Sequence, residues 1–142
     1  MEGAEPDTLI CEGSVEVFED MNKIVADMKL YVRMRKELVK LLGPECAGDI
    51  LDQQRDEAAG KIKNAIEEKL GACKLRWEVV EFSSQPVRRD VKREDACLPI
   101  RVVLHTHMRG IIFPSDLKEA LFDLQPVLDA LVFGRGCGGR RV

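Results

Sequence analysis

The chain has 142 residues, of which 45% are hydrophobic and 33% are charged, and its formal net charge is −3. This length allows one domain with a buried core, and the apolar fraction is too high for a chain that is disordered throughout. The apolar runs are far shorter than the ~20 residues of a membrane-spanning helix, and the acidic N-terminus differs from a basic targeting presequence. We therefore expect a protein of the cytoplasm or nucleus that does not bind membranes.

The charges are unevenly distributed along the chain. Residues 1–20 contain acidic side chains and no basic one, whereas residues 21–42 are mainly basic. Pro6 and Gly13 discourage regular structure at the start of the chain, so residues 1–13 are predicted to be a flexible acidic leader. The five cysteines are scattered and form no Cys-x-x-Cys pair, which argues against a disulfide framework and against a zinc cluster.

Residues 14–42 are predicted to form a long amphipathic helix. Ser14 is a candidate N-cap, and acidic residues follow it in the first turn. Apolar residues then recur at alternating three- and four-residue steps, which is heptad spacing, with Arg35 in the one gap. Gly43 and Pro44 would end the helix. The stripe is expected to be a protein interface formed by Met21, Val25, Met28, Val32, Arg35, Val39 and Leu42.

A second helix is predicted over residues 49–71, and Gly60 within it weakens that prediction. The short connection at Gly43 and Pro44 favours an antiparallel pair of helices. After Gly71, apolar residues alternate with charged ones until the phase changes at Val80, which indicates a strand with a bulge. Trp77 lies in this alternation and is expected to pack in the core rather than to anchor a partner.

A second strand is predicted from Ile100 to about His107, with alternate residues on opposite faces. Ser115 then begins a helix that Pro126 should kink or restart. These elements predict an α+β fold, in which an N-terminal antiparallel helical hairpin, resembling a coiled coil, precedes a small antiparallel sheet and a kinked C-terminal helix. The expected divisions are the leader at 1–13, one domain at 14–133 and a flexible Gly/Arg tail at 134–142. Within that domain, residues 14–71 would form the helical hairpin and residues 72–133 a strand-strand-helix head.

Few residues suggest catalysis or metal binding. His105 and His107 should point the same way from their strand, but two ligands are too few for a closed metal site. No nucleophile motif, metalloprotease helix or phosphate-binding loop is present. We therefore expect no metal, no cofactor and no catalytic residue, and a small enzyme with a site near the two histidines is the weakest of three hypotheses.

Basic residues provide a second candidate surface, which could contact an acidic protein or the phosphates of a nucleic acid. Acidic neighbours in the loop and the small aromatic fraction of 5% weigh against nucleic acid. The candidate contacts are Lys29, Arg33, Lys36, Lys40, Arg88, Arg89, Arg140 and Arg141.

The apolar stripe of residues 14–42 and a sheet of few strands together give more apolar surface than one copy could easily bury. The leading hypothesis is therefore a non-enzymatic protein-protein interaction subunit or adaptor of an intracellular assembly. It would form a homodimer, or join a hetero-complex, through residues 14–42. The alternative is a nucleic-acid-associated protein that uses the basic helix face, the loop at residues 87–93 and the Gly/Arg tail.

Overall fold

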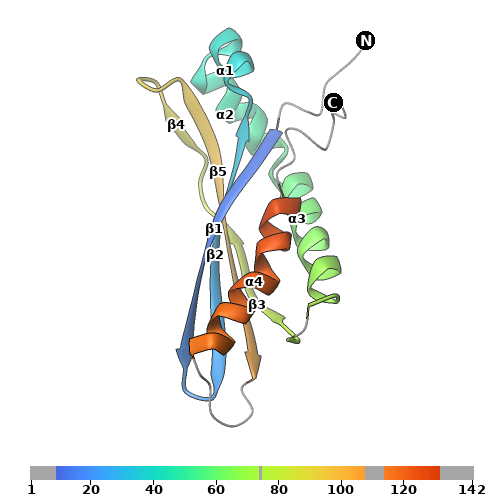
Figure 1. Ribbon diagram of the computed structural model, residues 1–142. Helices are drawn as coiled ribbons and strands as arrows, with labels where there is room; N and C mark the ends of the chain where they lie inside the picture. Colours follow the sequence, from blue (N-terminus) through green and yellow to red (C-terminus); the bar gives the residue numbers. More distant parts are fainter. Residues whose placement is uncertain (1–8, 74, 108–113, 132–142) are drawn as a thin grey trace.

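The computed structural model describes residues 9–73, 75–107 and 114–131, and it begins with strands rather than helices. Figure 1 shows a long, twisted antiparallel sheet with helices packed against one of its faces. The elements in chain order are β1 (Leu9–Asp20), β2 (Lys23–Met34), α1 (Lys36–Leu42), α2 (Pro44–Gln53), α3 (Arg55–Leu70), β3 (Glu78–Ser84), β4 (Arg88–Asp90), β5 (Asp95–His107) and α4 (Pro114–Ala130).

The predicted N-terminal helical hairpin is wrong, and so is the coiled coil expected from it. Residues 14–42 lie mostly in the antiparallel strands β1 and β2, and β1 already begins at Leu9, within the segment expected to be a leader. Apart from Val25, the buried residues of β2 alternate along the strand, and they include Ile24, Met28 and Val32. An interval of four residues fits both a helix turn and two strand repeats, so the apparent heptads arose from a strand pattern.

The strands form one sheet in the order β1-β2-β5-β3, and β4 also pairs with β5. All pairings are antiparallel, and β5 is bonded to β2 along one side and to β3 and β4 along the other. The register between β3 and β5 shifts between Val79 and Glu81, which confirms the predicted bulge. The strand predicted over residues 100–107 is also confirmed, although it begins earlier, at Asp95.

A tight turn and a close contact shape the β1–β2 hairpin. Asp20 pairs with Lys23, so the turn contains only Met21 and Asn22, and Met21 adopts a left-handed φ of 55°. On the strand, Gly13 lies so close to Leu30 that an added Cβ would be 2.4 Å from the Cδ2 atom of Leu30. A side chain at this position would therefore force either the Leu30 side chain or β1 to shift.

The core lies between the sheet and the helices. Alternate residues of β2 and β5 point into it, and α2, α3 and α4 supply the opposite wall (Figure 1). Trp77 is only 7% exposed, which confirms the expectation that it packs in the core. Fully buried large side chains include Ile24, Met28, Leu30, Leu51, Ile62, Ile66, Leu98, Ile100, Leu104, Leu124 and Leu131.

The helical segments differ from expectation in their boundaries. The helix predicted over residues 49–71 is divided into α2 and α3 at Gln54, and α4 continues through Pro126 without a break. Gly43 ends α1 as predicted. Within the described part of the chain, no helix is both long enough and apolar enough to cross a bilayer.

Candidate interaction surface on the sheet

The open face is the face of the sheet that points away from α2, α3 and α4. Its side chains occupy the strand positions between the buried ones, and most of them are exposed or half-buried. Antiparallel sheets commonly keep one face in water. The register aligns these side chains in rows across the strands, and the main members are Glu12, Ser14, Glu16, Phe18, Val25, Asp27, Lys29, Tyr31, Arg33, Arg101, Val103, His105, Glu78 and Glu81.

Ion pairs cross the middle of the open face. The Arg101 guanidinium donates hydrogen bonds of 2.9 and 3.1 Å to the two carboxylate oxygens of Asp27, and a weaker one of 3.4 Å to Glu81. The hydrogen bonds from Arg101 lower the pKa of Asp27, although partial burial opposes this shift. The bidentate pair fixes the Arg101 guanidinium against β2, so its charge is largely compensated.

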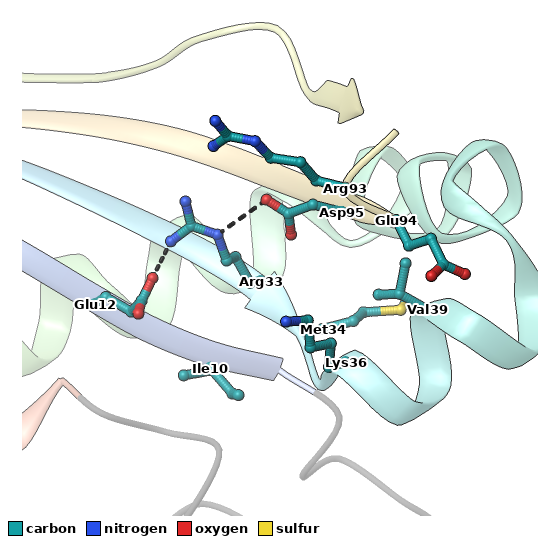
Figure 2. A pocket seen from close by; sticks show the side chains of 9 residues that line it. All are labelled: Ile10, Glu12, Arg33, Met34, Lys36, Val39, Arg93, Glu94 and Asp95. Atoms are coloured by element: carbon teal, nitrogen blue, oxygen red, sulfur yellow. Dashed lines mark hydrogen bonds and ion pairs between the residues drawn. The ribbon is translucent and has the colours of Figure 1, made fainter. Parts of the chain in front are cut away.

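A pocket of about 410 Å³ lies at the end of the sheet where β2 leads into α1, and Arg33 is at its centre (Figure 2). Arg33 donates hydrogen bonds to Glu12 and, over 3.3 Å, to Asp95, and its guanidinium lies 5.3 Å from the centre of the Tyr31 ring. The pocket lining contains as many acidic as basic side chains, and it comprises Ile10, Glu12, Arg33, Met34, Lys36, Val39, Arg93, Glu94 and Asp95. This balance of charge gives the pocket no clear preference for an anion.

The residues predicted as a protein interface do not lie on one surface. Met28, Val32 and Val39 are buried in the core, at 0%, 1% and 1% exposure. Val25 is on the open face but is only 8% exposed, whereas Met21 projects from the hairpin turn at 85% exposure. The two remaining residues lie near α1, Arg35 before its first residue and Leu42 at its end.

The predicted basic surface is also divided. Lys29 and Arg33 are on the open face because they alternate in β2 with the buried residues, whereas Lys36 and Lys40 are on α1. Arg88 is on the open face of β4, and its neighbour Arg89 points to the helix side. Arg140 and Arg141, with the rest of the tail at 134–142, lie outside the described residues.

Arg89 is held by the acidic side of α2. Its guanidinium donates hydrogen bonds to Asp49 over 2.9 Å and to Asp52 over 3.0 Å, and these contacts raise the pKa of Arg89 and lower that of Asp52. The side chain crosses Gly48, where an added Cβ would lie 2.4 Å from the Arg89 Nε atom. Arg89 therefore fastens β4 to α2 and is not available to a partner.

His105 and His107 do share one face, as predicted, with ring centres 5.4 Å apart. The Nε2 atom of His105 is 3.1 Å from a carboxylate oxygen of Glu78 on the neighbouring strand. In the described ranges, no group of three or more His, Cys, Asp or Glu side chains is arranged to hold a metal ion.

Two of the described cysteines, Cys73 and Cys97, have thiols of raised pKa. Burial raises the pKa of Cys73, whose Sγ atom lies 3.3 Å from the carbonyl oxygen of Asp123, and burial also raises the pKa of Cys97. A raised pKa keeps a thiol protonated, and the protonated form is a poor nucleophile.

The outer edge of β1 is the surface that the sequence reasoning missed. β1 is a terminal strand of the sheet, paired with β2 over its whole length. On the other side of β1, the main-chain groups between Glu12 and Asp20 form no hydrogen bond with any residue that the structure describes. The signal for it in the sequence was the alternation of apolar and polar residues over 26–34, which indicates a strand rather than the middle of one long helix.

No protein-family model matches the sequence, and comparison with curated proteins and with solved structures found no match. The function is therefore argued from the geometry of this molecule alone.

Proposed function

We propose that the chain is a non-enzymatic protein-protein interaction subunit that accepts an extended segment of a partner along the outer edge of β1. The observation that carries the proposal is the row of main-chain groups on that edge, between Glu12 and Asp20, that form no hydrogen bond with any residue in the described ranges. An exposed edge of this kind is a template for a further strand, as in β-augmentation. The partner segment would become the next strand of the sheet.

The hairpin turn identifies which groups are available. A two-residue turn closes on a hydrogen-bonded pair, here Asp20 and Lys23. The N–H and C=O groups of successive residues in a strand point to opposite sides of that strand. Asp20 and every second residue before it therefore direct their N–H and C=O groups towards β2. The residues between them direct their N–H and C=O groups outward, and these are Gly13, Val15, Val17 and Glu19.

The two edges of the sheet differ in how they are protected. The edge opposite β1 is formed by β3 and the three-residue β4, with a bulge in β3 between Val79 and Glu81. Between these strands, the N–H of Gln85 bonds to the carbonyl of Pro99 over 2.8 Å. Short strands and bulges are devices that prevent further pairing. β1 has 12 residues, its pairing with β2 is continuous, and it contains no proline, so its main-chain edge is open and only its acidic side chains restrict which strand can pair with it.

A pair of substitutions at one position tests the proposal. Val15→Pro removes an outward N–H, whereas Val15→Ala also changes the side chain but keeps the N–H. Each variant, as the full chain, would be used to capture proteins from cell extract, after circular dichroism has shown that it is folded. We expect partners that use the edge to remain with Val15→Ala and to be lost with Val15→Pro. Retention of every partner by a folded Val15→Pro would refute the edge as the binding surface.

The nucleic-acid hypothesis has less support because its basic residues are dispersed or, like Arg33 and Arg89, held by carboxylates. Titration of the full chain with single- and double-stranded oligonucleotides at two salt concentrations tests it. Binding that weakens steeply with salt and survives Val15→Pro would favour the nucleic-acid hypothesis over the proposed interaction.

A further inference from the structure

We infer that the segment accepted by β1 is basic, with lysine or arginine at every fourth residue on the side that continues the open face. This inference rests on the proposed function and specifies the chemistry of the partner. It follows from the spacing and the surroundings of the acidic residues of β1.

Three acidic side chains of β1 lie on the open face at equal intervals. Glu12, Glu16 and Asp20 are four residues apart, which corresponds to about 14 Å between neighbours on an extended strand. Ser14 and Phe18 lie between them, and β1 contains no basic residue. An added strand would place its own side chains directly beside these three carboxylates.

The β2 residues beside Glu12, Glu16 and Asp20 show which of these three carboxylates would attract a basic side chain of the partner most strongly. Glu12 is already bonded to Arg33, and Asp20 lies opposite Lys23 in the register. Glu16 instead lies opposite Asp27, whose own charge is compensated by Arg101. Glu16 forms no ion pair with any residue that the structure describes. Its counterion can therefore come from the outer side, where the partner would lie.

Phe18 adds an apolar position to the pattern. It is 45% exposed and lies opposite Val25 on the open face. A partner side chain beside Phe18 would cover a ring that the sheet itself leaves partly in water, so we expect an apolar residue there. The complete pattern is basic residues at every fourth position, with an apolar residue midway between the two that face Glu16 and Asp20.

A second copy of the chain fits this edge less well than a basic segment. Pairing of β1 with itself would add four more carboxylates, those of Glu12, Glu16, Glu19 and Asp20, and no basic residue. Like charges on adjacent strands are destabilising. A partner of opposite charge removes this repulsion.

The test uses three synthetic peptides of equal length that carry threonine at most positions and either lysine, serine or glutamate at every fourth position. Each is titrated against the full chain, with affinity measured by fluorescence anisotropy and amide exchange of β1 followed by NMR. Three favourable cross-strand pairs should make the lysine peptide bind about tenfold more tightly than the serine peptide. Protection should appear at the outward amides of Gly13, Val15, Val17 and Glu19.

Charge reversal on the chain supplies the matched control. Glu16→Lys should weaken the lysine peptide about fivefold and strengthen the glutamate peptide. Glu67→Lys, on the exposed side of α3, changes the net charge equally and should leave both affinities unchanged.

The outcomes separate this inference from the proposed function. Equal binding of the lysine and serine peptides, with β1 amides protected, would overturn the basic partner and leave edge binding intact. Lysine-peptide binding that protects no β1 amide would overturn the inference, because the attraction would then be unspecific. Protection of the same amides in the free chain at high concentration, with dimerisation in light scattering, would identify a second copy as the occupant. No protection by any peptide, together with unchanged partners for Val15→Pro, would overturn the proposed function itself.

Discussion

Gly48 provides a test of how the β4 hairpin is fastened to the helical layer. Gly48 lies within α2, where alanine would normally stabilise a helix by about 1 kcal/mol. In this fold, however, a Cβ at residue 48 would lie 2.7 Å from the Cγ atom of Arg89 and 2.8 Å from its Cζ atom. Gly48→Ala must therefore displace Arg89 from Asp49 and Asp52, and we expect no stabilisation, or a loss, in the wild-type background.

The same substitution should act in the opposite direction once Arg89 is absent. In the Arg89→Ala background the three atoms nearest to the new methyl group are removed, so Gly48→Ala should raise the free energy of unfolding by about 1 kcal/mol, which is about 3 °C in Tm for a chain of this size. The four proteins form a double-mutant cycle that can be measured by urea denaturation with circular dichroism. Equal stabilisation in both backgrounds would show that Arg89 does not cross Gly48.

Three further predictions concern the turn, the last helix and the open face. Met21→Asn should raise the free energy of unfolding by roughly 1 kcal/mol, since Met21 is 85% exposed and asparagine tolerates its φ of 55° better; no gain in urea denaturation would contradict the strained turn. Pro126→Ala should stabilise α4 by roughly 2–3 kcal/mol, because proline within a helix removes a hydrogen bond, and an unchanged Tm would argue against a continuous α4. The pKa of Asp27 is lower in the folded chain than its ordinary 3.8, so Asp27 stabilises the fold above about pH 4 and loses this contribution as the pH falls towards the lowered value. Arg101→Gln should flatten that part of the stability-pH profile, and an unchanged profile would exclude the Arg101 contact as its cause.

The sequence predicted the second half of the sheet better than the first. The alternation around His105 and the phase change at Val80 are each compatible with only one structure. The faces of β5 and the bulge in β3 could therefore be predicted from the sequence. Residues 14–42 have two readings, because Ile24, Met28 and Val32 are four residues apart. Alanine at position 26 and the long side chains at 28 and 34 also suit a helix, and only pairing with β5 decides for a strand.

The turn and the edge could not be recognised for a related reason. Hairpin turns are usually signalled by Asn-Gly or Asp-Gly, and here the turn is Met21–Asn22, which carries no glycine. Without the turn, β1 was not seen as a strand, and its outer edge could not be considered as a surface. Acidic residues such as Glu16 and Asp20 also suit the first turn of a helix, so their charge does not distinguish a strand from a helix.

The position of β5 has a consequence for synthesis on the ribosome. The β1–β2 hairpin is translated first, whereas β5, which pairs with β2, and α4, which contacts β1, are translated last. At ordinary elongation rates the nascent hairpin waits roughly several seconds with its apolar side uncovered. During that interval its negative charges would repel identical hairpins on neighbouring ribosomes of the same messenger, which lowers the chance that nascent chains aggregate before their own β5 arrives.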